Sequence, residues 1–482
     1  MRYRVRTSFR TTGLVVLLGV VMTMLDTTIV NVALGTLARD FHATLATIQW
    51  AATGYLLAMS MTVPVTGWAV GRFGVRNVWL GSLVLFVAGS ALCAAAWSLW
   101  SLVAFRVVQG VGGGLLQPVG QMMLAQAAGK ERMGRAMGLI SVPAMLVPVL
   151  GPPLGGLLVQ GPGWRWLFLV NLPVCAVALL AALLLLPREG GAGQRQPLDV
   201  LGLALLSPGL AAVVYGLSEV GNGASLPHPA LWIGVALVAV FVWRSLRGTS
   251  PHGTSLRGTS LRGTSLRGTS LHSTSLRGTS LLDLRLFGDR TFAAAVLALA
   301  CYSAAMLGFT VLVPLYSQLA EGGTALEAGL LLAPMGIGAA ITMPLAGKLT
   351  DSRGPRGTGA AGVVLVVASI AAFVLAGGGL VPMFTLGLGH GLVATSVMAA
   401  AFRTLEPAAI PAATTLSTIV LRLAGPFGVA LVAVLLQVFT RAGVAQPYPY
   451  TFWVAAGLAG VSLLPIALIG SGTWRRSSSA PA

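Results

Sequence analysis

The sequence predicts an all-α membrane protein that crosses the bilayer many times. Hydrophobic residues make up 56% of the 482 positions and charged residues only 9%, whereas soluble domains carry about 25% charged residues. Apolar runs recur along the chain, each near the roughly 20 residues that a helix needs to span a bilayer. Lys and Arg gather in alternate gaps between these runs, as they do in membrane proteins. These observations exclude a soluble enzyme, a disordered chain and a disulfide scaffold.

Fourteen apolar runs are long enough to predict membrane-spanning helices, and we expect the first to be retained as a helix rather than cleaved as a signal peptide. The predicted spans, in order, are 13–34, 48–70, 78–96, 100–128, 137–159, 166–186, 199–218, 229–244, 291–315, 326–347, 358–376, 380–402, 411–439 and 451–470.

The distribution of basic residues predicts the orientation of these spans. With the N-terminus in the cytoplasm, 25 of the 30 Lys and Arg residues fall on cytoplasmic ends and loops, three on outer loops and two inside apolar runs. Cytoplasmic loops of membrane proteins are rich in Lys and Arg. We therefore expect a multi-pass protein of the cytoplasmic membrane with both termini inside. The net charge of +18 is explained by this topology, so nucleic acid is not an expected partner.

Two kinds of repeat divide the chain. Residues 246–280 are seven five-residue units of the LRGTS type, a low-complexity segment that we expect to be a disordered linker. Gly67–Arg76 (GWAVGRFGVR) and Gly347–Arg356 (GKLTDSRGPR) share the pattern G-x-x-x-x-x-x-G-x-R after the second and tenth runs. This spacing predicts two parallel halves of six helices with two helices between them. The predicted domains are a six-helix bundle at 1–198, two additional helices at 199–245, the linker at 246–290 and a second six-helix bundle at 291–482.

Four further motifs resemble those of one transporter family. They are LDTTIVNVAL at 25–34, RVVQGVGGG at 106–114, GPPLGG at 151–156 and WRWLFLVNLP at 164–173. Their order and their positions on the helices resemble the major facilitator superfamily, and more closely its fourteen-helix drug:proton antiporters of the EmrB/QacA type. The resemblance implies the major facilitator fold, with 6+2+6 helices. It also implies that Gly67, Arg72, Gly74 and Arg76 gate the transport cycle together with Asp351.

The first loop departs from the family pattern. The family usually has an acidic residue where this chain has Gly71, whereas Asp351 keeps that carboxylate in the second half. The resemblance implies a charge interaction that stabilises the outward-facing state, and the first half lacks the carboxylate for it, although Arg72 and Arg76 remain.

Asp26 is the only carboxylate deep within a predicted helix, and we expect it to carry protons. An acid at the centre of a membrane helix costs roughly 2.5–3.5 kcal/mol, and an apolar environment favours its neutral form. An alternative is a structural Asp that bonds a neighbouring helix. Arg106 is its predicted partner, because a guanidinium stays charged and needs an anion or several carbonyls. The resemblance implies that Arg106 takes part in proton transfer, and the alternative is a fixed tether between helices.

Other polar and aromatic residues are weaker candidates. Gln109 and Gln117 share a helix face with Arg106 at steps of three and four residues. Arg422 lies in the thirteenth run, where we expect a mainly structural role, and His390 is either a titrating or a neutral hydrogen-bonding residue. On helices that line the central cavity in this fold, the candidate substrate contacts are Asn31, Tyr55, Gln109, Gln117, Tyr302, Phe309 and His390.

The GPPLGG motif predicts a bend in the fifth helix. Pro152 and Pro153 remove backbone donors, while Gly151, Gly155 and Gly156 permit close packing. The family interpretation is a hinge and leak seal between the halves, and the alternative is an ordinary kinked helix. No metal-binding set and no ATP-binding motif is recognisable, so we expect no cofactor and a proton gradient as the energy source.

The predicted function is proton-coupled efflux of amphipathic small molecules by alternating access. One alternative keeps the fold but exports a single endogenous product such as an antibiotic or siderophore. A remote alternative is a receptor or scaffold that does not transport. We do not expect an enzyme. The expected partners are a small-molecule substrate, protons and the lipid bilayer, and we expect the chain to act as a monomer.

Overall fold

The computed structural model describes residues 9–129, 132–187, 198–221, 228–247, 282, 284–323 and 325–470, and within them every regular element is a helix. The repeat segment 246–280 therefore lies outside the described residues except for its first two positions.

The first part of the chain forms one bundle of antiparallel helices. The segment from Trp50 to Phe73 is divided into two helices by a 3₁₀ turn at Val63–Val65 (η1), which contains Pro64. Proline supplies no backbone N–H to a continuous helix. The helices are α1 (Phe9–Asp40), α2 (Leu45–Ile48), α3 (Trp50–Thr62), α4 (Thr66–Phe73), α5 (Val75–Ala94), α6 (Leu99–Ala128), α7 (Met133–Gln160), α8 (Trp166–Leu169) and α9 (Asn171–Leu185).

Two helices follow, and then a second bundle. The pair α10 and α11 pack on each other, and α10 also contacts α3 of the first bundle and α16 of the second. The pair consists of α10 (Val200–Gly221) and α11 (Pro229–Arg247). The second bundle consists of η3 (Leu284–Gly288), α12 (Arg290–Leu315), η4 (Tyr316–Ala320), α13 (Ala325–Arg353), α14 (Pro355–Leu375), α15 (Leu380–Arg403), η5 (Pro407–Ala409), α16 (Ile410–Arg441), α17 (Pro447–Val461) and α18 (Leu463–Leu468).

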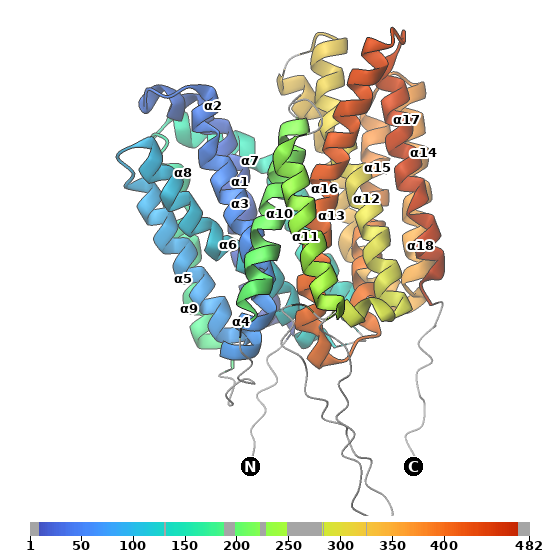
Figure 1. Ribbon diagram of the computed structural model, residues 1–482. Helices are drawn as coiled ribbons and strands as arrows, with labels where there is room; N and C mark the ends of the chain where they lie inside the picture. Colours follow the sequence, from blue (N-terminus) through green and yellow to red (C-terminus); the bar gives the residue numbers. More distant parts are fainter. Residues whose placement is uncertain are drawn as a thin grey trace, which may run out of the picture.

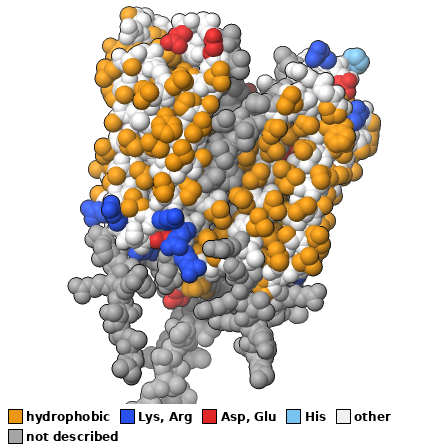
Figure 2. All heavy atoms as spheres, turned by 180° about the vertical axis from the view of Figure 1, so that it is seen from behind, with side chains coloured by type: hydrophobic (Ala, Val, Ile, Leu, Met, Phe, Trp, Pro, Cys, Tyr) orange, Lys and Arg blue, Asp and Glu red, His pale blue; other side chains and the backbone are white. Residues whose placement is uncertain are grey.

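The helices have the length and apolar surface of a membrane protein. Twelve described segments are long and apolar enough to cross a bilayer. Two further stretches, Trp50–Phe73 with its break and Met133–Gln160, correspond to the second and fifth predicted spans but are not among the twelve. The prediction of a polytopic helical protein is therefore confirmed, and the count of fourteen stays a prediction. Figure 2 shows hydrophobic side chains over the middle of the described surface, with Lys, Arg, Asp and Glu near its two ends.

The two bundles stand side by side, with α10 and α11 alongside them (Figure 1). We call the end where α4 ends and α7 begins the lower end, as it is drawn in Figure 1, and the opposite end the upper end. Between the bundles, α7 packs on α13 and α15, and α16 packs on α4 and α6. The domain boundaries predicted from the sequence remain a proposal.

Glycine contacts between the bundles lie near the lower end. A Cβ atom on Gly134 of α7 would collide with the carbonyl oxygen of Gly347 on α13. One on Gly138 would lie 2.8 Å from the carbonyl oxygen of Met343. Real Cβ atoms do not approach backbone so closely, so these glycines allow the bundles to meet backbone to backbone.

Candidate functional site

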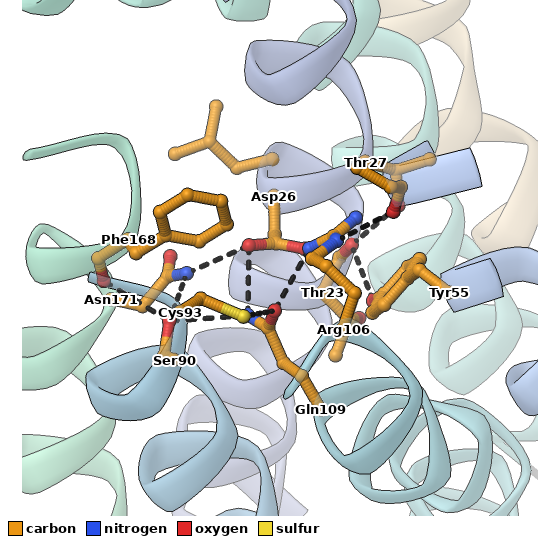
Figure 3. Close-up of polar contacts among 12 residues, drawn as sticks. Thr23, Asp26, Thr27, Tyr55, Ser90, Cys93, Arg106, Gln109, Phe168 and Asn171 are labelled. Atoms are coloured by element: carbon orange, nitrogen blue, oxygen red, sulfur yellow. Dashed lines mark hydrogen bonds and ion pairs between the residues drawn. The ribbon is translucent and has the colours of Figure 1, made fainter. Parts of the chain in front are cut away.

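A buried carboxylate in the middle of α1 is the centre of a polar network in the first bundle (Figure 3). Asp26 is fully buried. Its Oδ2 accepts a hydrogen bond of 2.5 Å from the Arg106 guanidinium of α6. Its Oδ1 accepts from the amide nitrogens of Gln109 and Asn171, each at 2.9 Å. Each of these contacts is a donor to the carboxylate, so the arrangement suits the ionised form of Asp26.

Arg106 has other partners besides the carboxylate. The same terminal nitrogen that donates to Asp26 also donates to Gln109 Oε1 at 2.8 Å, and Nε donates to the carbonyl oxygen of Ala51 at 3.1 Å. The guanidinium lies over the Tyr55 ring, 4.0 Å from its centroid, and 5.8 Å from that of Phe168. An aromatic face attracts a cation at such distances. The buried cation is thus held by one carboxylate, two oxygens and two rings.

Ser90 on α5 completes the network and was missed by the sequence analysis. Its Oγ accepts from Gln109 at 3.1 Å and from Asn171 at 2.9 Å, and donates to the carbonyl oxygen of Phe168 at 3.0 Å. Asn171 was also missed, although it lies within the motif 164–173. An amide in an apolar run was the available signal, because such a group needs a partner in the membrane. For Ser90 no comparable signal existed.

Glycines of α6 and α5 bring the network together. A Cβ on Gly89 would lie 2.6 Å from Gln109 Cα, and one on Gly110 would lie 2.6 Å from the Tyr55 carbonyl oxygen. One on Gly113 would lie 2.8 Å from the Tyr55 hydroxyl. The glycine-rich sequence after Arg106 therefore lets α3 and α5 approach α6 closely enough for short polar side chains to meet.

The second bundle holds a different polar pair at Tyr302 and His390. The Tyr302 hydroxyl and His390 Nδ1 are 2.9 Å apart, and their ring centroids are separated by 5.5 Å. No carboxylate is bonded to this pair among the described residues. Phe309 on the same helix as Tyr302 is fully buried and packs its ring against Phe373 and Phe452.

The remaining candidates from the sequence have no hydrogen bond to the Asp26 network among the described residues. Gln117 is half-buried two turns beyond Gln109 on α6. Asn31 lies on α1, and its side chain is outside the described part of the chain. Arg422 lies on α16 with its Nε buried and unpartnered among the described residues. Within the same part of the chain, no group of three or more His, Cys, Asp or Glu residues lies close enough to hold a metal ion.

A family model and a relative that matches most of the chain identify the family. The model described as Major Facilitator Superfamily matches residues 16–429. A multidrug resistance protein B homolog of Mycobacterium tuberculosis is 37% identical over 439 residues, which cover 89% of this chain and 76% of that protein. The chain belongs to the Major Facilitator Superfamily. The family resemblance found in the motifs is thereby confirmed, and so is the expectation that the protein is a membrane transporter rather than an enzyme.

Other relatives match part of the chain or its fold. A putative multidrug resistance protein MdtD of Enterobacter sp. is 36% identical over 234 residues, 48% of this chain and 49% of that protein. Two solved superfamily structures share the fold at low identity. The human organic anion transporter MFSD10 has a TM-score of 0.60 and 17% identity over 95% of this chain and 99% of its own. A double-tryptophan mutant of XylE has a TM-score of 0.63 and 14% identity over 97% of both chains.

The first superfamily loop repeat contacts both bundles. A Cβ on Gly67 would lie 3.3 Å from Thr415 Oγ1 on α16 of the other bundle. Gly74 has a φ of 82° between α4 and α5, a conformation that glycine adopts without strain. Arg76 donates to the carbonyl oxygens of Leu183 and Leu186 near the end of α9, at 3.2 and 3.1 Å.

Arg72 and Gly71 belong to the same repeat but have fewer contacts. Arg72 lies exposed in the last turn of α4. A Cβ on Gly71 would meet nothing within 4 Å.

The second loop repeat carries a carboxylate that the first repeat lacks. Asp351 Oδ1 accepts a hydrogen bond of 2.8 Å from the backbone N–H of Gly134 in the first turn of α7, and Oδ2 lies 3.4 Å from Arg135 Nε. A carboxylate is favourable at a helix N-terminus because the first N–H groups point toward it. Gly354 has a φ of 90° and occupies the place of Gly74.

The GPPLGG motif packs α7 against α1 close to Asp26. A Cβ on Gly151 would collide with the side chain of Thr28, and one on Gly155 would lie 3.2 Å from the Ile29 carbonyl oxygen. One on Gly156 would meet nothing within 4 Å. The backbone is helical through Pro152 and Pro153, whose side chains lie outside the described residues. The role of this motif as a hinge remains a prediction.

Proposed function

We propose that this protein exports amphipathic small molecules across the cytoplasmic membrane in exchange for protons, by alternating access. The observation that carries the proposal is the fully buried Asp26–Arg106 pair, whose carboxylate also accepts hydrogen bonds from the side-chain amides of Gln109 and Asn171. The names of the relatives, multidrug resistance protein B homolog and putative multidrug resistance protein MdtD, support drug efflux as the direction of transport.

The lower end is the proposed cytoplasmic side. It carries the starts or ends of α4, α7, α13 and α15 with their basic residues, whereas Arg39, Arg165 and Arg441 are at the upper end. Lys and Arg favour the cytoplasmic side of a membrane. With this orientation the bundles meet on the cytoplasmic side, which corresponds to a state closed to the cytoplasm. The start of α1 and the end of α18 then both face inside.

Asp26 is the proposed proton carrier. In the ionised form it accepts three N–H hydrogen bonds and neutralises Arg106. A proton on the carboxyl group would place an O–H among groups that are all donors, so the network must rearrange when the proton arrives. That rearrangement is the means by which protonation changes the packing of α1, α5, α6 and α9.

Asn171 is the proposed acceptor for the protonated carboxyl group. Its Nδ2 donates to both Asp26 and Ser90, while its Oδ1 is buried without a hydrogen-bond partner. A buried polar atom without a partner costs free energy. Rotation of the amide by half a turn would bring Oδ1 to the Asp26 O–H. Asn171 thereby has one arrangement for each protonation state.

The loss of negative charge on Asp26 also affects Arg106. A buried cation without an anion is unfavourable, and Arg106 keeps only the Ala51 carbonyl, the Gln109 oxygen and the aromatic rings. Release of the proton to the cytoplasm restores the ion pair. The two charge states therefore favour different packings of the first bundle, which is what coupling to alternating access requires.

Efflux measurements in energised cells or inverted vesicles test this proposal. We expect export of a panel of cationic, neutral and anionic fluorescent amphiphiles, and we expect a protonophore to abolish it. Asp26→Asn should reduce gradient-driven efflux to background while the protein still inserts. Asp40→Asn, an exposed carboxylate on the same helix, is the matched control and should retain efflux. Full efflux by Asp26→Asn would refute proton coupling through this residue.

The same panel tests the choice between a multidrug pump and an exporter dedicated to one endogenous product. Export of several unrelated amphiphiles supports the former. Absence of all export by correctly inserted protein would refute the broad specificity proposed here and point to a dedicated exporter.

A further inference from the structure

Arg422 is a second arginine at membrane depth, and the proposed proton step does not use it. It lies twelve residues after the start of α16 (Ile410–Arg441), which places it about 18 Å along the helix axis. Its Nε atom is buried and has no hydrogen-bond partner, and no carboxylate pairs with it among the described residues. A guanidinium at membrane depth without an anion is costly, so Arg422 calls for a ligand or a structural reason.

The packing of α16 shows which way Arg422 points. Thr415, seven residues earlier on the same face, meets Gly67 of the first bundle. Gly425 and Gly428 face α12, where a Cβ on either would collide with Leu307 or Ala304. Leu423 and Ala430 pack toward α10. Since the faces toward α12 and α10 are occupied, Arg422 lies on the face toward the first bundle.

The first bundle does not supply a carboxylate to Arg422. Tyr55 on α3 lies close enough to Arg422 to interact with its charge. The Asp26 carboxylate is already engaged by Arg106, Gln109 and Asn171. In the sequence, the stretch of α7 whose side chains are not described contains no Asp or Glu. The three charged groups Asp26, Arg106 and Arg422 therefore leave one positive charge uncompensated.

Arg422 is also partly accessible. The residue as a whole is half-buried although it lies on the face of α16 toward the first bundle. Two turns lower, Thr415 lies close to Gly67 of the first bundle. A partly accessible guanidinium among helices, in a region with a net positive charge, is suited to an anionic group with an apolar body.

We propose that Arg422 binds the anionic group of an amphipathic organic anion, such as a carboxylate or sulfonate, in the space between the two bundles. The inference rests on the proposed function and names a substrate class for it. A guanidinium binds a carboxylate or sulfonate through two parallel N–H donors, and this pairing is strong where water is scarce. Neutral amphiphiles gain less from the site, and cations are repelled by it.

Equilibrium binding to the purified full-length protein in nanodiscs tests the inference without relying on transport. The probes are fluorescein as the anion and rhodamine 123 as the cation of similar size, and binding is followed by fluorescence polarisation. Removal of one charge-assisted contact is expected to weaken affinity by roughly ten- to a hundredfold. Arg422→Gln should therefore weaken fluorescein binding by this factor and leave rhodamine 123 binding unchanged or stronger.

Two further variants separate binding from folding. Arg422→Lys keeps the charge and should retain most of the fluorescein affinity, although it loses the bidentate geometry. Arg441→Gln removes an exposed charge from the upper end of the same helix and should leave both affinities unchanged. If Arg422→Gln weakens both dyes equally, or if wild-type protein binds rhodamine 123 and not fluorescein, the anion site is refuted. Neither result would refute proton-driven export, which is tested separately through Asp26.

Discussion

The two bundles place their carboxylates in different locations. The first bundle buries an ion pair, Asp26 with Arg106, and has the uncharged Gly71 at the acidic position of its loop repeat. The second bundle has a part-buried hydrogen bond between Tyr302 and His390 in its interior and keeps Asp351 in its loop repeat. The first bundle thus carries its carboxylate, the proposed proton carrier, in its interior, whereas the carboxylate of the second bundle bonds to the start of α7 in the first.

The backbone of the loop is repeated although its carboxylate is not. Gly74 and Gly354 both have positive φ, at 82° and 90°, and both precede a helix. Gly67 and Gly347 both lie against a helix of the opposite bundle. Glycine is needed at such places for reasons of backbone geometry and close approach, whereas the carboxylate depends on what the facing helix offers. The two loops can therefore share a backbone geometry without sharing a carboxylate.

The largest expected difference between the bundles is in how much stability is lost when a buried polar residue is replaced. Arg106→Gln removes one partner of a buried ion pair and should lower the free energy of unfolding by about 3–5 kcal/mol. His390→Gln alters one part-buried hydrogen bond to Tyr302 and should cost only about 1 kcal/mol. Chemical unfolding in mixed micelles, followed by tryptophan fluorescence, measures both. Equal losses in the two variants would contradict the proposed difference between the interiors.

The next effect separates the two loops by their packing. Gly347→Val places side-chain atoms where a Cβ alone would lie 2.7 Å from the Gly134 carbonyl oxygen, whereas Gly71→Val meets open space. The first variant should cost about 1–3 kcal/mol and open the lower end, and the second should do neither. Labelling of Met343→Cys, a buried position in a cysteine-free background, by a membrane-impermeant thiol reagent reports the opening. Slow labelling of both variants would show that the contact is dispensable.

A smaller effect is expected from the loop carboxylate. Asp351→Asn keeps the shape of the side chain but removes the charge that faces Gly134 N–H and Arg135. Because this site is partly exposed, the loss should be about 1 kcal/mol. The same Met343→Cys labelling should become severalfold faster. Labelling as slow as in the parent would mean that packing alone closes the lower end.

The smallest effect is expected from restoring the missing acid. Gly71→Asp would place a carboxylate on α4, which packs on α16. The start of α16 contains Pro411, which has no N–H to donate, so the gain should be less than about 1 kcal/mol. Labelling of Met343→Cys should become slower, by a smaller factor than the one by which Asp351→Asn makes it faster. A larger gain in stability would show that the first loop needs only a carboxylate to bind α16 as the second loop binds α7.

Composition and periodicity by themselves determined the class of this protein. Apolar runs of this length must form helices in a bilayer. Lipid offers no hydrogen bonds, so the backbone N–H and C=O groups of each run must bond to one another. For the same reason a lone Asp in such a run, as at position 26, had to have a partner, and Arg106 was the available cation. The glycine loop repeat indicated two related halves through backbone requirements that are visible in sequence.

Only the tertiary structure decided which small polar groups complete the site. Ser90 and Asn171 are common residue types whose importance depends on α5 and α9 reaching the same point as α1 and α6. Likewise, Asp351 meets the start of α7, more than 200 residues away in sequence. The isolation of Arg422 also depends on which face of α16 turns toward the other bundle. Contacts between helices distant in sequence depend on packing, and no local pattern specifies them.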